Sequence, residues 1–163
     1  MPDGSINEPY YSYSRRDYAV IVALDEQGNC ICVQQYRHGI KQVTTEFCAG
    51  GIERTDGKEY GGSKTASEDA LAAAQRELLE ETGYESNEWQ HLMTIPSNAT
   101  IADNYAHLFL AKNCKKVAGQ SLDDNEFLDV ITISKEQLSN LIKNGEFQQA
   151  MHVLAWMLAG ERL

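Results

Sequence analysis

Short apolar runs separated by polar turns dominate the first third of the chain. The run at 18–24 is rich in β-branched residues, and a second apolar run at 30–36 follows the glycine-containing turn at 25–29. Two such runs joined by a short turn predict a β-hairpin. We expect a third strand at 43–48, and the polar, glycine-containing segment 54–66 reads as a loop.

The middle of the chain has a helical pattern. Leu71, Ala74 and Leu78 recur at helical spacing and form an apolar stripe suited to a core. We expect this helix to begin near Ser67 and to end before Gly83, which stands where a C-terminal cap belongs. Further strands are expected at 89–95, 105–111 and 127–133, and helices at 134–145 and 147–158. This order predicts an α/β (α+β) fold in which helices cover both faces of a mixed sheet.

Length and composition fit one soluble domain. The 163 residues allow a single domain over 1–163, within which we expect 1–16 to be a flexible or dimer-contacting N-terminal segment. No stretch approaches the roughly 20 apolar residues of a membrane span, and the polar start lacks the apolar core of a signal peptide. We therefore expect a cytoplasmic protein that does not bind membranes. The four cysteines lack zinc-ligand spacing, and we expect buried free thiols.

The net charge narrows the class of partner. With 24 acidic and 14 basic residues the formal charge is -10, which disfavours a protein that binds nucleic acid. A phosphate-containing small molecule remains compatible with this charge if a metal ion supplies the missing positive charge.

Three carboxylates lie close together on the predicted central helix. At roughly 100° per residue, Glu77, Glu80 and Glu81 fall within about 100° of one another. Their mutual repulsion raises their pKa values unless a cation intervenes, and carboxylate oxygens are ligands that Mg²⁺ prefers. The alternative is a solvated acidic face. We expect no base at i,i+4 spacing to neutralise them, and the small Ala70 and Ala73 beside them suit the approach of a ligand.

The same segment resembles the Nudix box. That pattern is a Gly, five residues, a Glu, seven residues and then R-E-U-x-E-E-x-G-U, where U is aliphatic. It is matched at Glu68, Arg76, Glu77, Leu78, Glu80, Glu81 and Gly83, and Tyr84 departs from the aliphatic preference. Residues 47–53 resemble the PAG-x-I-E strand end of the ADP-ribose pyrophosphatase-like branch. On this likeness the box glycine is Gly50, followed by an insertion of about twelve residues, and Gly62 matches the literal spacing by coincidence.

The resemblance implies a Nudix fold and a site that uses two or more Mg²⁺ or Mn²⁺ ions. The metal ligands it implies are Glu77, Glu80, Glu81 and the Ala49 carbonyl. Arg76 would orient Glu77, and Glu68 would assist the metal site or help to position water. The substrate-binding residues it implies are Arg37, Glu46, Gly50 and Gly51. The general base stays open among Glu80, Asp124 and Glu126.

The function implied is hydrolysis of the pyrophosphate bond of a nucleoside-diphosphate derivative. A nucleoside-diphosphate sugar such as ADP-ribose is favoured, which would give a nucleoside monophosphate and a sugar phosphate. One alternative is a Nudix hydrolase of nucleoside triphosphates or dinucleoside polyphosphates, and another is a Nudix domain that binds a nucleotide without hydrolysing it. Residues 96–99 (PSNA) replace the Ser-Pro-Gly-like turn typical of ADP-ribose enzymes. A homodimer is compatible with the resemblance, and Tyr10, Tyr11 and Tyr13 are candidates either for stacking on a base or for a plain surface role.

Overall fold

A computed structural model describes residues 2–53, 68–122 and 127–163 of the chain. An eight-stranded sheet forms its centre, with β1 between β2 and β4 on one edge and β7 on the other. The strands are β1 (Tyr18–Asp25), β2 (Cys30–Arg37), β3 (Gln42–Glu46), β4 (Cys48–Gly51), β5 (Tyr84–Glu85), β6 (Glu88–Pro96), β7 (Tyr105–Lys116) and β8 (Leu128–Ile133). The helices are α1 (Ala70–Thr82), α2 (Lys135–Lys143) and α3 (Ala150–Gly160).

The sheet branches along one edge of β1. The first half of β1 pairs antiparallel with β4, from Tyr18 opposite Gly51 to Ile21 opposite Cys48. The second half pairs antiparallel with β2 at Ala23 and Leu24, and β2 then continues to pair with β3 and β8. On its other edge β1 runs parallel to β7, so the sheet is mixed.

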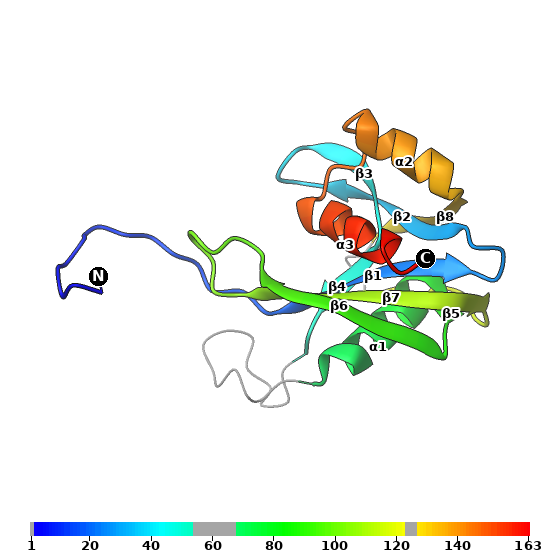
Figure 1. Ribbon diagram of the computed structural model, residues 1–163, viewed down its shortest axis with the longest axis horizontal. Helices are drawn as coiled ribbons and strands as arrows, with labels where there is room; N and C mark the ends of the chain where they lie inside the picture. Colours follow the sequence, from blue (N-terminus) through cyan, green and yellow to red (C-terminus); the bar gives the residue numbers. More distant parts are fainter. Residues whose placement is uncertain (1, 54–67, 123–126) are drawn as a thin grey trace.

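Alternating side chains of β1 feed two separate hydrophobic cores, because successive residues of a strand point to opposite faces. Val20, Val22 and Leu24 pack in a core with residues of α2 and α3. Ala19, Ile21 and Ala23 pack in a second core with Ala74 and Leu78 of α1. Figure 1 shows α1 on one side of the sheet and α2 and α3 on the other. The prediction of a mixed sheet between helices is confirmed.

Most predicted elements are present with shifted ends. The β1–β2 hairpin is confirmed, and its turn contains Gly28 at φ 80°. The expected third strand is instead two strands, since β3 ends at Glu46 and β4 begins at Cys48. The prediction that α1 begins near Ser67 is wrong: Asp69 is the N-cap, and its carboxylate accepts hydrogen bonds from the Leu71 and Ala72 amides.

Caps and burial elsewhere agree with the sequence pattern. Gly83 caps the end of α1 in the left-handed conformation with φ 71°, and Ser134 and Gln137 form a capping box at the start of α2. The buried residues of α3 are His152, Ala155 and Ala159. The cysteines are buried free thiols, as expected, at positions 30, 32, 48 and 114.

The N-terminal segment extends away from the body of the domain in Figure 1. Its residues from 2 to 16 are exposed, yet its last part is held against the loop before β7. The Tyr13 amide donates to the Ile101 carbonyl at 2.9 Å, and the Ser14 hydroxyl donates to the Asp103 carboxylate at 3.0 Å. None of the helices in the described part of the chain is both long and apolar enough to span a membrane.

Candidate active site

Two acidic side chains of α1 are buried against β4. The exposed fractions are 9% for Glu77 and 4% for Glu81, because α1 packs closely on this strand. The Ala49 amide donates to Glu81 Oε2 at 3.3 Å. Gly50 lies directly under the other carboxylate, since a Cβ atom added at Gly50 would stand 1.8 Å from Glu77 Cδ. Gly50, which the resemblance implied as the box glycine, thus lies against α1, whereas Gly62 lies outside the described residues.

Arg76 joins the acidic residues of the box into one cluster. Its guanidinium donates to Glu68 at 2.8 Å, to Glu77 at 2.9 Å and to Glu80 at 3.0 Å. It also donates to the Gly51 carbonyl at 3.1 Å. The pairing with Glu80 contradicts our expectation that no base stands at i,i+4 spacing, because Arg76 is four residues before Glu80.

Opposing influences set the charges of this cluster. Partial burial disfavours the charged guanidinium of Arg76, but the three carboxylates outweigh it and raise its pKa further above the ordinary value. Burial likewise raises the pKa of Glu68, and hydrogen bonds from Arg76 and the Glu53 amide outweigh this effect, so that the net shift is downward. Arg76 and Glu68 are therefore held in their charged forms at neutral pH.

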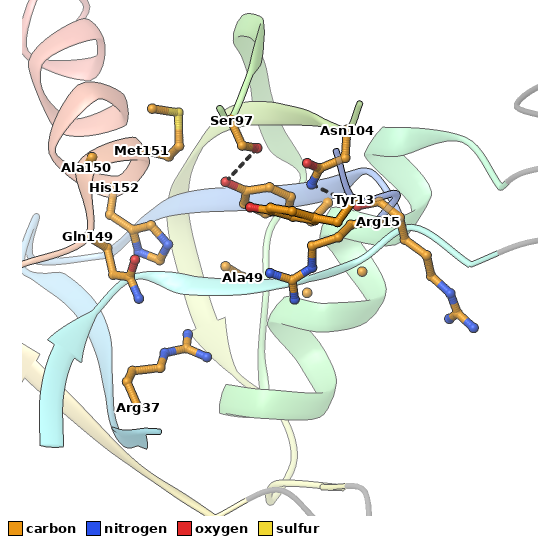
Figure 2. Close-up of a pocket in the computed structure, with 14 residues that line it drawn as sticks. Tyr13, Arg15, Arg37, Ala49, Ser97, Asn104, Gln149, Ala150, Met151 and His152 are labelled. Atoms are coloured by element: carbon orange, nitrogen blue, oxygen red, sulfur yellow. Dashed lines mark hydrogen bonds between the residues drawn. The ribbon is translucent and has the colours of Figure 1, made fainter. Parts of the chain in front are cut away.

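A cavity of about 630 Å³ opens beside this cluster. Its volume falls within the range of small-molecule sites. Side chains from the N-terminal segment, β2, β4, the β6–β7 loop and α3 surround it, as Figure 2 shows. The lining residues are Tyr13, Arg15, Arg16, Tyr18, Arg37, Ala49, Gly50, Gly51, Ser97, Asn104, Gln149, Ala150, Met151 and His152.

Arg37 projects into the cavity from the end of β2 and is held from behind by Glu46. The guanidinium forms two hydrogen bonds with the Glu46 carboxylate, of 2.8 Å from Nε and 2.5 Å from Nη2. The Thr44 hydroxyl and the Gln149 side-chain amide also donate to Glu46. Burial raises the pKa of Glu46, but these donors outweigh it and lower the pKa overall, while the Glu46 hydrogen bonds raise that of Arg37.

Glu46 itself does not line the cavity. We expected a substrate-binding residue, but its side chain is fully buried on the same side of β3 as Thr44. Residues i and i+2 of a strand share a face, so both lie beneath the cavity wall. The arrangement makes Glu46 a residue that orients Arg37.

The other predicted residues divide into three groups. The cavity is lined by Arg37, Gly50 and Gly51, which we predicted to bind substrate, and by Ala49, whose carbonyl we predicted as a metal ligand. The described box carboxylates do not line the cavity. Glu81 and Glu77 contact Ala49 and Gly50 of β4, and these two residues line the cavity. Asp124, Glu126 and the inserted segment lie outside the described residues. Of the three tyrosines considered for stacking, only Tyr13 lines the cavity, and Tyr11 is 82% exposed.

Several lining residues were not anticipated from the sequence. Ser97, Asn104, Gln149 and His152 come from loops and a helix start that are distant in the chain. The pair Arg15 and Arg16, directly before β1, also lines the cavity, and none of the ion pairs among the described residues includes either arginine. The adjacent pair Arg15 and Arg16 could have indicated an anion-binding position in the sequence, whereas Gln149 and His152 belong to no recognisable sequence pattern.

The carboxylates of α1 are of the type that binds a hard divalent cation, although they do not converge on one position. Among the described residues, no three His, Cys, Asp or Glu side chains are close enough together to hold a metal ion. The site nevertheless supplies carboxylate oxygens from Glu77 and Glu81, buried beside the backbone of Ala49. Such oxygens are the ligands that Mg²⁺ selects, and Gly50 leaves the space that Glu77 occupies.

Comparison with known proteins places the chain among characterised families. The NUDIX domain family matches residues 14–156. A methanol dehydrogenase activator from Bacillus methanolicus is 29% identical over 136 residues, which cover 83% of this chain and 67% of that protein. An ADP-ribose pyrophosphatase from Bacillus subtilis (strain 168) is 28% identical over 131 residues, covering 80% of this chain and 64% of the relative.

A further relative and a solved structure extend the comparison. An ADP-ribose pyrophosphatase from Mycobacterium tuberculosis is 31% identical over 97 residues, which cover 60% of this chain and 42% of that protein. The chain thus spans about two thirds or less of these relatives' lengths. A crystal structure of an ADP compounds hydrolase shares the fold, with a TM-score of 0.70 at 22% identity over 91% of this chain and 72% of that one. Since the family match extends over most of the chain, this protein belongs to the Nudix family.

Proposed function

We propose that this protein hydrolyses the pyrophosphate bond of a nucleoside-diphosphate sugar, with ADP-ribose as the leading candidate. The products would be a nucleoside monophosphate and a sugar phosphate. The observation that carries the proposal is the buried pair Glu77 and Glu81 beside Ala49 and Gly50, at the edge of an arginine-lined cavity of about 630 Å³.

The charges of the site suit a diphosphate. Arg37 is fixed by Glu46 and faces the cavity, where it would hold a non-bridging phosphate oxygen. Arg15 and Arg16 add two cationic side chains from the N-terminal segment. The chain as a whole has a formal charge of -10, so this local group of arginines is the feature that would attract an anionic substrate.

The acidic cluster suits a divalent metal. Glu77 and Glu81 would be the principal ligands, with Glu80 and the Ala49 carbonyl contributing. A bound Mg²⁺ or Mn²⁺ supplies Lewis-acid polarisation of phosphoryl oxygens and lowers the pKa of bound water. Arg76 orients Glu77 through its 2.9 Å hydrogen bond and balances part of the acidic charge. Glu80 is a candidate general base, and its carboxylate accepts from Arg76 at 3.0 Å.

The substrate class is supported by the names of two relatives, both ADP-ribose pyrophosphatases. Tyr13 and Tyr18 line the cavity with aromatic rings on which a nucleobase could stack. The tyrosine hydroxyl of Tyr18 accepts a hydrogen bond from Ser97, within the PSNA segment that stands where ADP-ribose enzymes carry a different turn.

The test is a substrate panel with Mg²⁺, in which products are separated by chromatography. The panel contains ADP-ribose, ADP-glucose, UDP- and GDP-sugars, a diadenosine polyphosphate and nucleoside triphosphates. We expect release of a monophosphate and a sugar phosphate from one class of sugar nucleotide, and complete loss of this release with EDTA. Glu81→Gln should reduce the rate by at least about 100-fold through loss of a metal ligand.

Glu85→Gln is the matched control, because Glu85 is an exposed residue of β5 outside the cluster. A rate for folded Glu81→Gln close to that of the control would refute the metal assignment. Hydrolysis confined to triphosphates or dinucleoside polyphosphates would establish the alternative enzyme class. Nucleotide binding without hydrolysis of any compound would establish a non-catalytic binding domain.

A further inference from the structure

His152 is a buried residue of the cavity wall that belongs neither to the proposed metal ligands nor to the arginines proposed to bind phosphate. It lies in the first turn of α3, and only 4% of its surface is exposed. Its ring stacks with Phe47 at 6.4 Å between centroids and 12° between planes. Phe147 meets the same ring edge-on at 6.5 Å. These two aromatic contacts fix the position of the imidazole.

One ring nitrogen of His152 is engaged by the backbone. The Phe47 amide donates a hydrogen bond to His152 Nδ1 at 3.1 Å. A nitrogen that accepts a hydrogen bond carries no proton, so the neutral imidazole holds its proton on Nε2. The fold thereby selects one of the two tautomers.

The environment also keeps the imidazole uncharged. Burial lowers the pKa of His152 to about 4, and repulsion from Arg37 acts in the same direction against attraction by Glu46. Arg37 and Glu46 are paired with each other, and Arg15 and Arg16 line the same cavity. At neutral pH the Nε2–H group is therefore a donor without a formal charge.

His152 Nε2 is available to a ligand. It makes no hydrogen bond to the described part of the chain. Two polar side-chain atoms there are fully buried without a partner, Arg76 Nε and His107 Nε2. His152 Nε2 is not among them, so it is accessible from the cavity. The residue lines the cavity together with Gln149 and Arg37. Figure 2 shows its imidazole projecting from α3 toward the space between Gln149 and Ala49.

We propose that His152 is a specificity-determining residue whose uncharged Nε2–H donates a hydrogen bond to an acceptor oxygen of the bound nucleotide. The inference rests on the proposed function for the identity of the ligand. Because the tautomer is fixed by the Phe47 amide, Nε2 can only donate, and it selects for an oxygen that can accept a hydrogen bond. A phosphate oxygen and a sugar hydroxyl oxygen both meet this requirement, and Arg37, which lines the same cavity, favours the phosphate.

Two substitutions separate the contact with Phe47 from the contact with the ligand. In His152→Asn the side-chain carbonyl can replace Nδ1 as acceptor for the Phe47 amide, while the donor at the Nε2 position is lost. In His152→Gln the longer side chain places an amide near the Nε2 position, and the acceptor for Phe47 is lost. We expect His152→Asn to raise KM about tenfold with kcat little changed, the effect of one hydrogen bond to a charged group. His152→Gln should keep KM within about threefold of the wild type and lower the Tm.

The opposite ranking, with native KM in His152→Asn and raised KM in His152→Gln, would overturn the proposal and make His152 a structural residue. A KM of the wild-type enzyme that improves on acidification with a midpoint between pH 6 and 7, and loses that dependence in His152→Asn, would also overturn it. That behaviour would require a charged imidazole.

A binding experiment on Glu81→Gln in EDTA tests the inference without hydrolysis. Long-range ¹H–¹⁵N spectra identify the tautomer, and we expect Nε2 to be protonated and its resonance to move on addition of ADP-ribose. A shift with ADP alone assigns the contact to a phosphate or to the nucleoside, and a shift with ADP-ribose only assigns it to the distal sugar. A proton on Nδ1, an unmoved resonance in the saturated complex, or no binding of either compound would each overturn the proposal. Binding with a shifted resonance, together with an inactive wild type, would refute the proposed reaction and leave this inference standing.

Discussion

Replacing Gly50 by alanine should remove activity while leaving the fold intact. Gly50 pairs with Ala19 of β1 in ordinary strand geometry, so alanine is compatible with its backbone. The added Cβ would stand 1.8 Å from Glu77 Cδ and 2.1 Å from Oε2. Ordinary contact begins near 3.4 Å, so the carboxylate must retreat by about 1.6 Å.

The size of this displacement sets the expected result. The carboxylate is the end of a flexible side chain and can rotate away, so we expect the free energy of unfolding to change by no more than about 1 kcal/mol. Misplacement of a catalytic group by about 1 Å can cost roughly 100-fold in rate. We therefore expect kcat of Gly50→Ala to fall by at least about 100-fold in the Mg²⁺-dependent assay.

Gly39→Ala provides the control for this experiment. A Cβ atom at Gly39 would have no neighbour within 4 Å, and this glycine lies in the turn between β2 and β3. Thermal unfolding of both variants, measured beside kcat, separates loss of the site from loss of the fold. Native kcat in Gly50→Ala would show that the position of the Glu77 carboxylate against β4 is irrelevant to the reaction.

Glu46, Gly83 and His152 each allow an independent test of a described contact. Glu46→Gln should raise KM about tenfold, because it removes the charge that orients Arg37; an unchanged KM in steady-state kinetics would contradict this role. Gly83→Ala should cost about 2 kcal/mol or more in a denaturant titration, since its φ is 71° and a Cβ would meet the Ala118 carbonyl oxygen at 2.2 Å. The depressed pKa of His152, about 4, means that the unfolded chain binds an extra proton below pH 6.5. Stability should thus be complete above pH 6.5 and fall by roughly 3 kcal/mol toward pH 4, and His152→Asn should lose this component of the pH profile.

The parts of the fold that were predictable depend on local pattern. The continuous apolar, β-branched run of β1 identified a strand, and Gly28 identified the turn after it. The start of α1 was less determined, because Ser67, Glu68 and Asp69 are all polar residues at the same boundary. The structure uses Asp69, while the Glu68 side chain accepts instead from the Glu53 amide and Arg76.

Other elements depend on partners distant in the chain. The two-residue strand β5 exists because Tyr84 and Glu85 pair with Lys116 and Lys115, which also extends β7 beyond the expected end. No local pattern of hydrophobicity encodes such a pairing.

The candidate site divides in the same way. The face of α1 that carries Glu77, Glu80 and Glu81 follows from helical spacing alone, and the resemblance added Ala49, Gly50 and Arg37. Gln149 and His152 reach the cavity only because α3 packs on the sheet. Strand alternation does place Glu46 on the same face as Thr44, but it does not show that this face lies beneath the cavity wall.

The two hydrophobic cores on either side of β1 support different parts of the site, one the acidic helix and the other the cavity wall. The acidic helix α1 rests on the core that contains Ala74 and Leu78. The cavity wall formed by α3 rests on the core that contains Phe47 and Phe147. Strand β4 connects the two parts of the site. Its residues Ala49 and Gly50 contact the acidic side chains of α1 and also line the cavity. An evolving lineage could thus repack the Phe47 side to accept a new nucleotide while inheriting its hydrolytic machinery unchanged.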